Sequence, residues 1–236
     1  MDVATVRRNR VREKKDRERA RIIRVARGLF FRNGYAGTTV DSIASALNVK
    51  KPFIYWYFDN KEALFAELCI RNAEAAISTL VDPADEPDPL KALYESCRRI
   101  ALVQILDYET SAITFREPNA LAATSRQRMN KYSHTYSVGL AKILNRAKRI
   151  DAVRCKNVRL TALAMGGIVT SLHRWYDPNG RLGPQDLAHE IACLMVGTAN
   201  GRDCQNLKPK RALKRFLDLD DEPWGAKYWW LTIDQV

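Results

Sequence analysis

Residues 38–64 read TTVDSIASALNVKKPFIYWYFDNKEAL. Apolar residues recur at helical spacing on both sides of Asn48, a residue that tolerates a positive φ angle at low cost. Thr39 suits the N-cap of the helix before this bend, and Pro52 suits the first turn of the helix after it. The stretch therefore predicts two short helices joined by a tight turn.

The spacing of the apolar residues is typical of a helix-turn-helix. With Val40 as position one, the motif needs buried residues at positions four, eight, ten, fifteen and eighteen, a small residue at five and a glycine-like residue at nine. The chain fills these seven positions, in that order, with Ile43, Leu47, Val49, Ile54, Tyr57, Ala44 and Asn48. Such packing leaves the second helix free to enter the major groove of DNA, which is about 12 Å wide.

Another helix precedes the motif. Apolar residues that include Ile22 and Phe30 repeat at helical spacing over roughly residues 16–33. Gly34 ends this helix, because glycine readily adopts the left-handed conformation of a helix C-terminus. The helix and the motif together predict a three-helix DNA-binding unit over residues 16–62.

The remaining sequence predicts a larger helical domain over residues 63–200 and a C-terminal extension over residues 201–236. Asp59 and Glu62 have the spacing of a capping box and open a helix that runs to about Leu80. No strand-like alternation is evident, so we expect an all-α fold. Further helices are predicted near residues 89–106, 119–149 (as one helix or with a break), 154–176 and 184–199.

Positive charge gathers at the N-terminal end of the chain. Lys and Arg outnumber Asp and Glu by 39 to 27 overall, and residues 1–61 hold 15 of these cations against 6 carboxylates. The densest part, residues 1–15, has no apolar period, so we expect a mobile basic arm or a frayed helix start. This distribution favours a polyanion such as nucleic acid as the partner.

Several classes of protein are not expected. No apolar run reaches the roughly 20 residues of a transmembrane helix, and no apolar stretch follows the basic N-terminus as in a secretory signal. The five cysteines form no C-x-x-C pair, which favours a reducing cytoplasm. The three histidines lack metal-ligand spacing and no G-x-S-x-G motif occurs, so we expect neither a metal site nor an enzyme.

Residues 18–68 resemble the DNA-binding region of TetR-family transcriptional repressors. The run IYWYFDNKE, residues 54–62, is the most specific part, and FFRNGY, residues 30–35, resembles the same family. Lys50 and Asn48 depart from the family pattern, which often has Ser or Thr and Gly there. The resemblance implies a ligand-responsive repressor that binds a near-palindromic operator as a homodimer and is released by a small-molecule effector.

The second helix of the motif is then the recognition helix. Lys51 is suited to donate to guanine, while Pro52 and Phe53 are suited to pack on thymine methyl groups. The resemblance implies phosphate contacts from Tyr55 and Lys61. The predicted DNA-binding residues are Thr39, Lys50, Lys51, Pro52, Phe53, Tyr55, Trp56 and Lys61, with Arg7, Arg8 and Arg10 from the basic arm.

The resemblance also implies a dimer interface and an effector pocket. The helices near residues 154–176 and 184–199 would pair with those of a second copy. The link WYDPNGRLGP, residues 175–184, resembles a subgroup that often binds acyl-CoA thioesters, although it also reads as the stop of a helix hairpin. Candidate pocket residues are Tyr108, Phe115, Arg116, Met129, Tyr132, Tyr136, Met165, Val169 and Leu172, with Arg116 or His134 as the polar anchor.

Two other functions remain open from the sequence. An architectural DNA-binding dimer would need no ligand, and an arginine-rich arm could instead bind RNA. No cofactor is expected in either case. The role of the Trp-rich extension over residues 201–236 is open.

Overall fold

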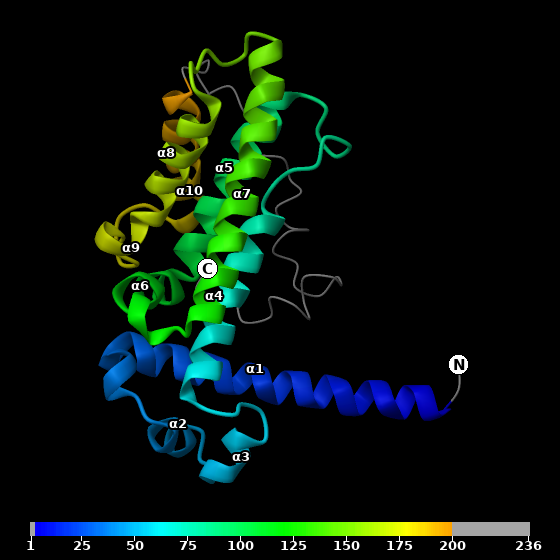
Figure 1. The fold of residues 1–236 in the computed structure, drawn as a ribbon, viewed down its shortest axis with the longest axis vertical. Helices are drawn as coiled ribbons and strands as arrows, with labels where there is room; N and C mark the ends of the chain where they lie inside the picture. The colour runs from blue at the N-terminus through cyan, green and yellow to red at the C-terminus, as the bar shows by residue number, and fades with distance from the viewer. Residues whose placement is uncertain (1–2, 200–236) are drawn as a thin grey trace.

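A computed structural model describes the chain over residues 3–199, with side chains described except those of residues 3–9, 11 and 118. Its regular elements are all helical, which confirms the predicted fold class (Figure 1). The extension over residues 201–236 lies outside the described residues. The helices are α1 (Val3–Gly37), α2 (Val40–Ala46), α3 (Lys51–Tyr55), α4 (Lys61–Ser78), α5 (Pro89–Leu106), α6 (Tyr108–Arg116), α7 (Ala123–Arg149), α8 (Val158–Thr170), α9 (Leu172–Trp175) and α10 (Pro184–Thr198), with a short 3-10 turn at Pro118–Ala120.

Of the two expectations for the basic N-terminal stretch, a mobile arm or a frayed helix start, the structure agrees with a helix: α1 is helical from Val3 onward and projects away from the rest of the molecule (Figure 1). Opposite charges four residues apart, such as Glu13 and Arg17, stabilise a helix even where no face is buried. The predicted break is present near the other end. Gly34 has φ 72° and interrupts the helical backbone.

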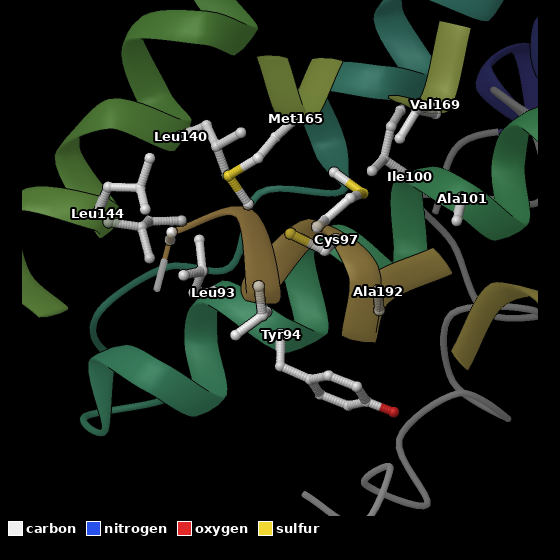
Figure 2. Packing of buried hydrophobic residues seen from close by; sticks show 14 of the residues in the cluster. Leu93, Tyr94, Cys97, Ile100, Ala101, Leu140, Leu144, Met165, Val169 and Ala192 are labelled. Carbon is white, nitrogen blue, oxygen red and sulfur yellow. The ribbon is translucent and has the colours of Figure 1, made fainter. Parts of the chain in front are cut away.

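Two apolar cores hold the molecule together. The first lies among α1, α2, α3 and the first half of α4, and it also takes in Ile113 and Leu121. The second lies among α5, α7, α8 and α10, whose side chains meet in Figure 2. In that figure Cys97 and Ile100 of α5 lie near Met165 and Val169 of α8.

Helix α4 belongs to both cores. Leu64 and Phe65 are buried in the first core, whereas Ala76 and Ile77 pack against the second. This helix therefore runs from the DNA-binding unit into the larger domain, as the sequence predicted. Its N-cap is Asn60, whose side-chain oxygen accepts a hydrogen bond of 2.7 Å from the amide of Ala63, so the capping box expected from residue 59 is wrong.

The middle of the chain is more divided than predicted. The helix expected over residues 119–149 begins only at Ala123, and α6 was not predicted as a separate helix. The segment expected as one helix over residues 154–176 forms α8 and α9 instead, with Asn157 as the N-cap of α8. Within residues 3–199 no helix is both long and apolar enough to cross a membrane.

Candidate DNA interface and sensing region

The helix-turn-helix forms as its sequence predicts. Thr39 caps α2 through reciprocal hydrogen bonds of 3.0 Å with Ser42, which join each backbone amide to the other side chain. Asn48 occupies the bend with φ 55°, and the amide of Val49 donates to the carbonyl of Ala44. The carbonyl of Ala44 at the C-terminal end of α2 therefore has a partner within the turn, which helps to fix how the chain leaves α2.

Helix α3 has one buried face and one exposed face. Ile54 is buried on the inner side, and the ring of Phe53 packs at 5.2 Å from that of Tyr57. Phe53 is consequently only half-exposed, unlike the predicted outward position. The outer face presents Trp56, which is 77% exposed, together with the exposed residues Lys50, Lys51, Pro52 and Tyr55.

Lys51 already has a partner on the motif. Its ammonium lies 2.7 Å from the carboxylate of Asp41 on α2, and this hydrogen bond raises the pKa of Lys51. Both side chains are well exposed, so water and salt weaken the pair. Because the pair is weak, Lys51 can leave Asp41 for another acceptor such as a base edge or a phosphate.

Two cations tie α1 to the motif. Lys61, predicted to contact a phosphate, donates to the carbonyls of Tyr35 and Thr38 at 2.8 and 2.9 Å and lies over the Tyr35 ring. Arg21 donates to the carbonyl of Leu47 at the end of α2. These bonds satisfy backbone oxygens where α1 and α2 end. A phosphate contact by Lys61 stays a prediction.

Arg19 fixes the other end of α3. It forms an ion pair with Glu67 of α4, donates to the carbonyl of Tyr57 and lies over the Phe58 ring at 4.3 Å. Burial acts to raise the pKa of Glu67, but Arg19 and Arg71 outweigh burial and lower it. The sequence analysis counted Arg19 only as part of the basic N-terminal stretch, because the helical period gives no indication that it pairs with Glu67.

A buried polar cluster lies where α1 meets α4, α5 and α6. Asp107, at the junction of α5 and α6, is 1% exposed and accepts hydrogen bonds from Arg27 at 3.1 Å, Asn72 at 2.9 Å and Thr110 at 2.6 Å. Arg27 also pairs with Glu109. Burial raises the pKa of Asp107 to about 6, although Arg27 and the other donors oppose the shift.

The cluster extends into the larger domain through uncharged side chains. The hydroxyl of Ser111 donates to Gln104, whose amide lies 3.4 Å from the side-chain oxygen of Asn72. We name the group formed by Arg27, Asn72, Gln104, Asp107, Thr110 and Ser111 the polar layer. The sequence analysis did not predict the polar layer. The one sequence signal for it is Asp107, an acidic residue directly after the apolar run of residues 100–106.

The predicted pocket residues lie in several parts of the larger domain. Tyr136, Met165, Val169 and Leu172 are buried in the second core. The others lie elsewhere: Tyr108 packs on Phe31 and Tyr176, Phe115 stacks on His173, Arg116 lies over Phe31, Met129 packs on the first core, and the Tyr132 hydroxyl donates to Glu74.

A groove of about 550 Å³ lies between α7 and α8. Its lining includes the cationic or ionisable residues His134, Lys142 and Arg159 and the apolar residues Val138 and Leu163. His134 is the alternative polar anchor that the sequence suggested. None of the other predicted pocket residues lines this groove.

Helices α8 and α10 share an apolar outer face. Leu160 and Leu194 are each 63% exposed, and Leu163 is nearly as exposed. A Cβ atom added at Gly167 or Gly197 would meet no atom within 4 Å. Large apolar side chains beside glycines form a surface that another helix can approach closely.

Comparison with known proteins identifies the family. Residues 22–68 match the family model described as bacterial regulatory proteins of the tetR family, and residues 86–198 match the tetracyclin repressor-like C-terminal domain. These two matches lie on the DNA-binding unit and on the larger helical domain respectively. The chain belongs to the TetR family. Membership places it among transcriptional regulators rather than enzymes.

Relatives and solved structures agree with this membership. TtgR of Pseudomonas putida, an HTH-type transcriptional regulator, is 32% identical over 100 residues, which cover 42% of this chain and 45% of TtgR. The chain thus aligns with less than half the length of this curated relative. PfmR, a TetR-family regulator from Thermus thermophilus, has the same fold, with a TM-score of 0.70, 22% identity and coverage of 77% of this chain and 98% of PfmR.

Another solved structure with this fold contains ligands. AibR in complex with isovaleryl coenzyme A and operator DNA aligns with a TM-score of 0.64 and 23% identity over 75% of this chain and 97% of AibR. At this identity the likeness establishes the shared fold alone.

Proposed function

We propose that this TetR-family protein is a transcriptional repressor that binds a near-palindromic operator as a homodimer and is released by a small-molecule effector. The observation that supports DNA reading most strongly is the outward face of α3, where Lys51, Tyr55 and Trp56 are exposed together. The chain just after α3 is held by Arg19, which donates to the carbonyl of Tyr57. A rigid helix with an exposed cationic and aromatic face is suited to enter a major groove. We infer a cytoplasmic location because the operator lies there.

Each side chain on this face has a distinct task in the proposal. Lys51 exchanges Asp41 for a guanine edge, and Pro52 and Trp56 make apolar contacts with bases. Tyr55 and Lys50 contact phosphates and fix the register. Arg10 and its neighbours in α1 add affinity that does not depend on sequence. Arg7 and Arg8 share this task by prediction only, because their side chains lie outside the described residues.

The dimer would form through the outer face of α8 and α10. Leu160, Leu163 and Leu194 supply apolar area, and Gly167 and Gly197 allow close helix approach. A two-fold symmetric pair presents two copies of α3 to two half-sites of the operator.

Fluorescence anisotropy with duplex DNA from upstream of the protein's own gene tests the assignment of α3. We expect Lys51→Ala to weaken binding about tenfold or more, because a base contact is lost in each subunit. Lys131→Ala is the matched control, since Lys131 is an exposed cation on α7. Equal affinity of the wild type and Lys51→Ala would contradict the assignment.

Sedimentation velocity tests the dimer. Leu160→Glu combined with Leu194→Glu places charge on the proposed interface and should convert dimer to monomer, because unpaired buried charge is costly. Ile150→Glu is the control, since Ile150 is 57% exposed at the end of α7 and belongs to neither α8 nor α10. A dimer that persists in the double variant would exclude this interface.

The effector is proposed to be a small organic molecule, with acyl-CoA thioesters as one class to test. AibR, which has the same fold, was solved with isovaleryl coenzyme A and operator DNA. A groove of 550 Å³ in the larger domain also favours a ligand-responsive regulator over an architectural DNA-binding dimer. Titrating isovaleryl coenzyme A into the protein–DNA complex tests the class. No release by this or related thioesters would exclude it.

A further inference from the structure

We propose that the groove between α7 and α8 binds an anion that carries an apolar chain, such as a carboxylate or a phosphate ester. That the groove binds such a ligand does not depend on the function proposed above. That this ligand is the effector of a repressor rests on that function. The groove is set apart from the buried residues that the sequence suggested as pocket walls, because Tyr136, Met165 and Val169 are packed inside the second core.

The charge of the groove argues for an anion. His134 and Lys142 reach it from α7, and Arg159 reaches it from α8. Among the residues that the structure describes, no carboxylate lines the groove and none forms an ion pair with any of these three side chains. Lys142 and Arg159 bring positive charge to the groove from two helices, and a bound anion would accept charge-assisted hydrogen bonds from them.

The polar groups around these cations add donors. Asn145 lines the groove beside Lys142 and offers an amide N–H. The hydroxyl of Ser137 donates to the carbonyl of Ser133, so Ser137 keeps only its lone pairs for a ligand, whereas Ser133 can donate. A carboxylate or phosphate accepts hydrogen bonds from each of these donors.

The apolar part of the lining argues for a chain on the anion. Val138, which lies between His134 and Lys142 on one face of α7, is 41% exposed, and Leu163 on α8 is 58% exposed. Ala141 lines the groove between them. His134 and Lys142 are two helical turns apart, about 12 Å along the axis, which leaves room for a chain beside one head group. The volume of 550 Å³ is within the range of small-molecule sites.

The position of the groove connects it with the DNA-binding unit. One residue before Ser133, the hydroxyl of Tyr132 donates to Glu74 of α4 at 2.7 Å. Four residues before Ser133, Met129 packs on the first core. A ligand that draws α7 toward α8 therefore acts on α4, the helix that enters both cores. Leu163 also belongs to the α8 and α10 face, so the same ligand would lie near the second subunit.

Calorimetric titration of octyl phosphate into the full-length protein tests the site. We expect octyl phosphate and octanoate to bind, and octanol and inorganic phosphate to bind at least about tenfold more weakly, because each lacks one of the two matching parts. Comparing octyl phosphate with octanoate identifies the preferred head group. Octanol binding as tightly as octyl phosphate would overturn the anion proposal.

Variants locate the binding. Lys142→Gln combined with Arg159→Gln should weaken octyl phosphate at least about tenfold, and Val138→Asp should do the same by repulsion. The control is Arg174→Gln combined with Arg181→Gln, which removes two exposed cations outside the groove. If octyl phosphate binds the Lys142→Gln and Arg159→Gln variant as tightly as it binds the wild type and the control, the proposal is overturned. Absence of binding to the wild type would also overturn it, and would mean that another part of the chain or a second copy covers the groove.

A parallel titration in the presence of bound operator DNA separates the two proposals. Release of DNA by octyl phosphate from the wild type, but not from the Lys142→Gln and Arg159→Gln variant, supports both. Binding to the groove without any release of DNA leaves the site intact and contradicts its role as the effector site.

Discussion

The two apolar cores differ in how they are built. The first core joins helices that follow one another closely in the chain, and aromatic side chains such as Phe30 and Phe65 fill it. Arg19 and Glu67 bind across its edge. The second core joins helices far apart in sequence, from α5 to α10, mostly through aliphatic side chains. Each core is a contiguous cluster of buried apolar side chains, so each should move as a unit.

The polar layer between the cores is different from both. Arg27, Asn72 and Asp107 meet through hydrogen bonds where α1 crosses α6. Hydrogen-bonded side chains can exchange partners, whereas a packed core resists continuous deformation. The difference suggests that the DNA-binding unit reorients at the polar layer, while both cores stay closed.

The largest expected effect distinguishes the two cores. Phe30→Ala removes a fully buried ring and should destabilise the protein by about 3–5 kcal/mol. Hydrogen exchange should then show lost protection in α2 and α3, while α5 and α8 keep theirs. Equal loss in all four helices would show that the cores do not behave as separate units. Met165→Ala is the reciprocal variant, with the loss expected in α5 and α8.

The polar layer is tested by breaking its ion pair. Arg27→Met leaves the buried carboxylate of Asp107 without its cation and should cost about 2 kcal/mol in urea unfolding, less than for a fully buried pair because Arg27 is partly exposed. Adding Asp107→Asn removes the unpaired charge, so the double variant should recover at least half of the loss. If the two substitutions lower the free energy of unfolding additively, a direct interaction between Arg27 and Asp107 is contradicted.

The smallest effect is a pH dependence. The pKa of Asp107 is raised from 3.8 to about 6, so between these values the folded chain binds a proton that the unfolded chain does not. This group's contribution to the free energy of unfolding should therefore increase, by about 1 kcal/mol, as the pH falls from 7 to 5. The measurement is the difference between the wild type and Asp107→Asn at both values. No change in that difference would contradict the raised pKa.

The sequence predicted the DNA-binding unit well because its signals are local. Thr39 caps the helix that it precedes, and Asn48 takes the positive φ angle that its position requires. Pro52 lies in the first turn of α3, and Ile54 faces inward. Each of these follows from neighbours within a few residues, so the period and the turn residues were sufficient.

The contacts of the larger domain are ones that no local sequence pattern predicts. Arg27 and Asp107 are 80 residues apart in the chain, and their pairing follows only from how α1 crosses α6. The groove joins α7 to α8 through residues such as Lys142 and Arg159 that each look like ordinary surface charge. Aromatic residues such as Tyr136 suggested a pocket but pack in a core, because the same residue types serve both purposes.

The central claim is that a pair of α3 helices reads a DNA sequence. Selection of duplexes from a random-sequence library by the full-length protein tests this claim most directly. The account predicts enrichment of a near-palindromic site with two equivalent half-sites, bound at least about a thousandfold more tightly than a scrambled duplex at equal salt. A library that yields no enriched sequence, with equal affinity for all duplexes, would contradict it.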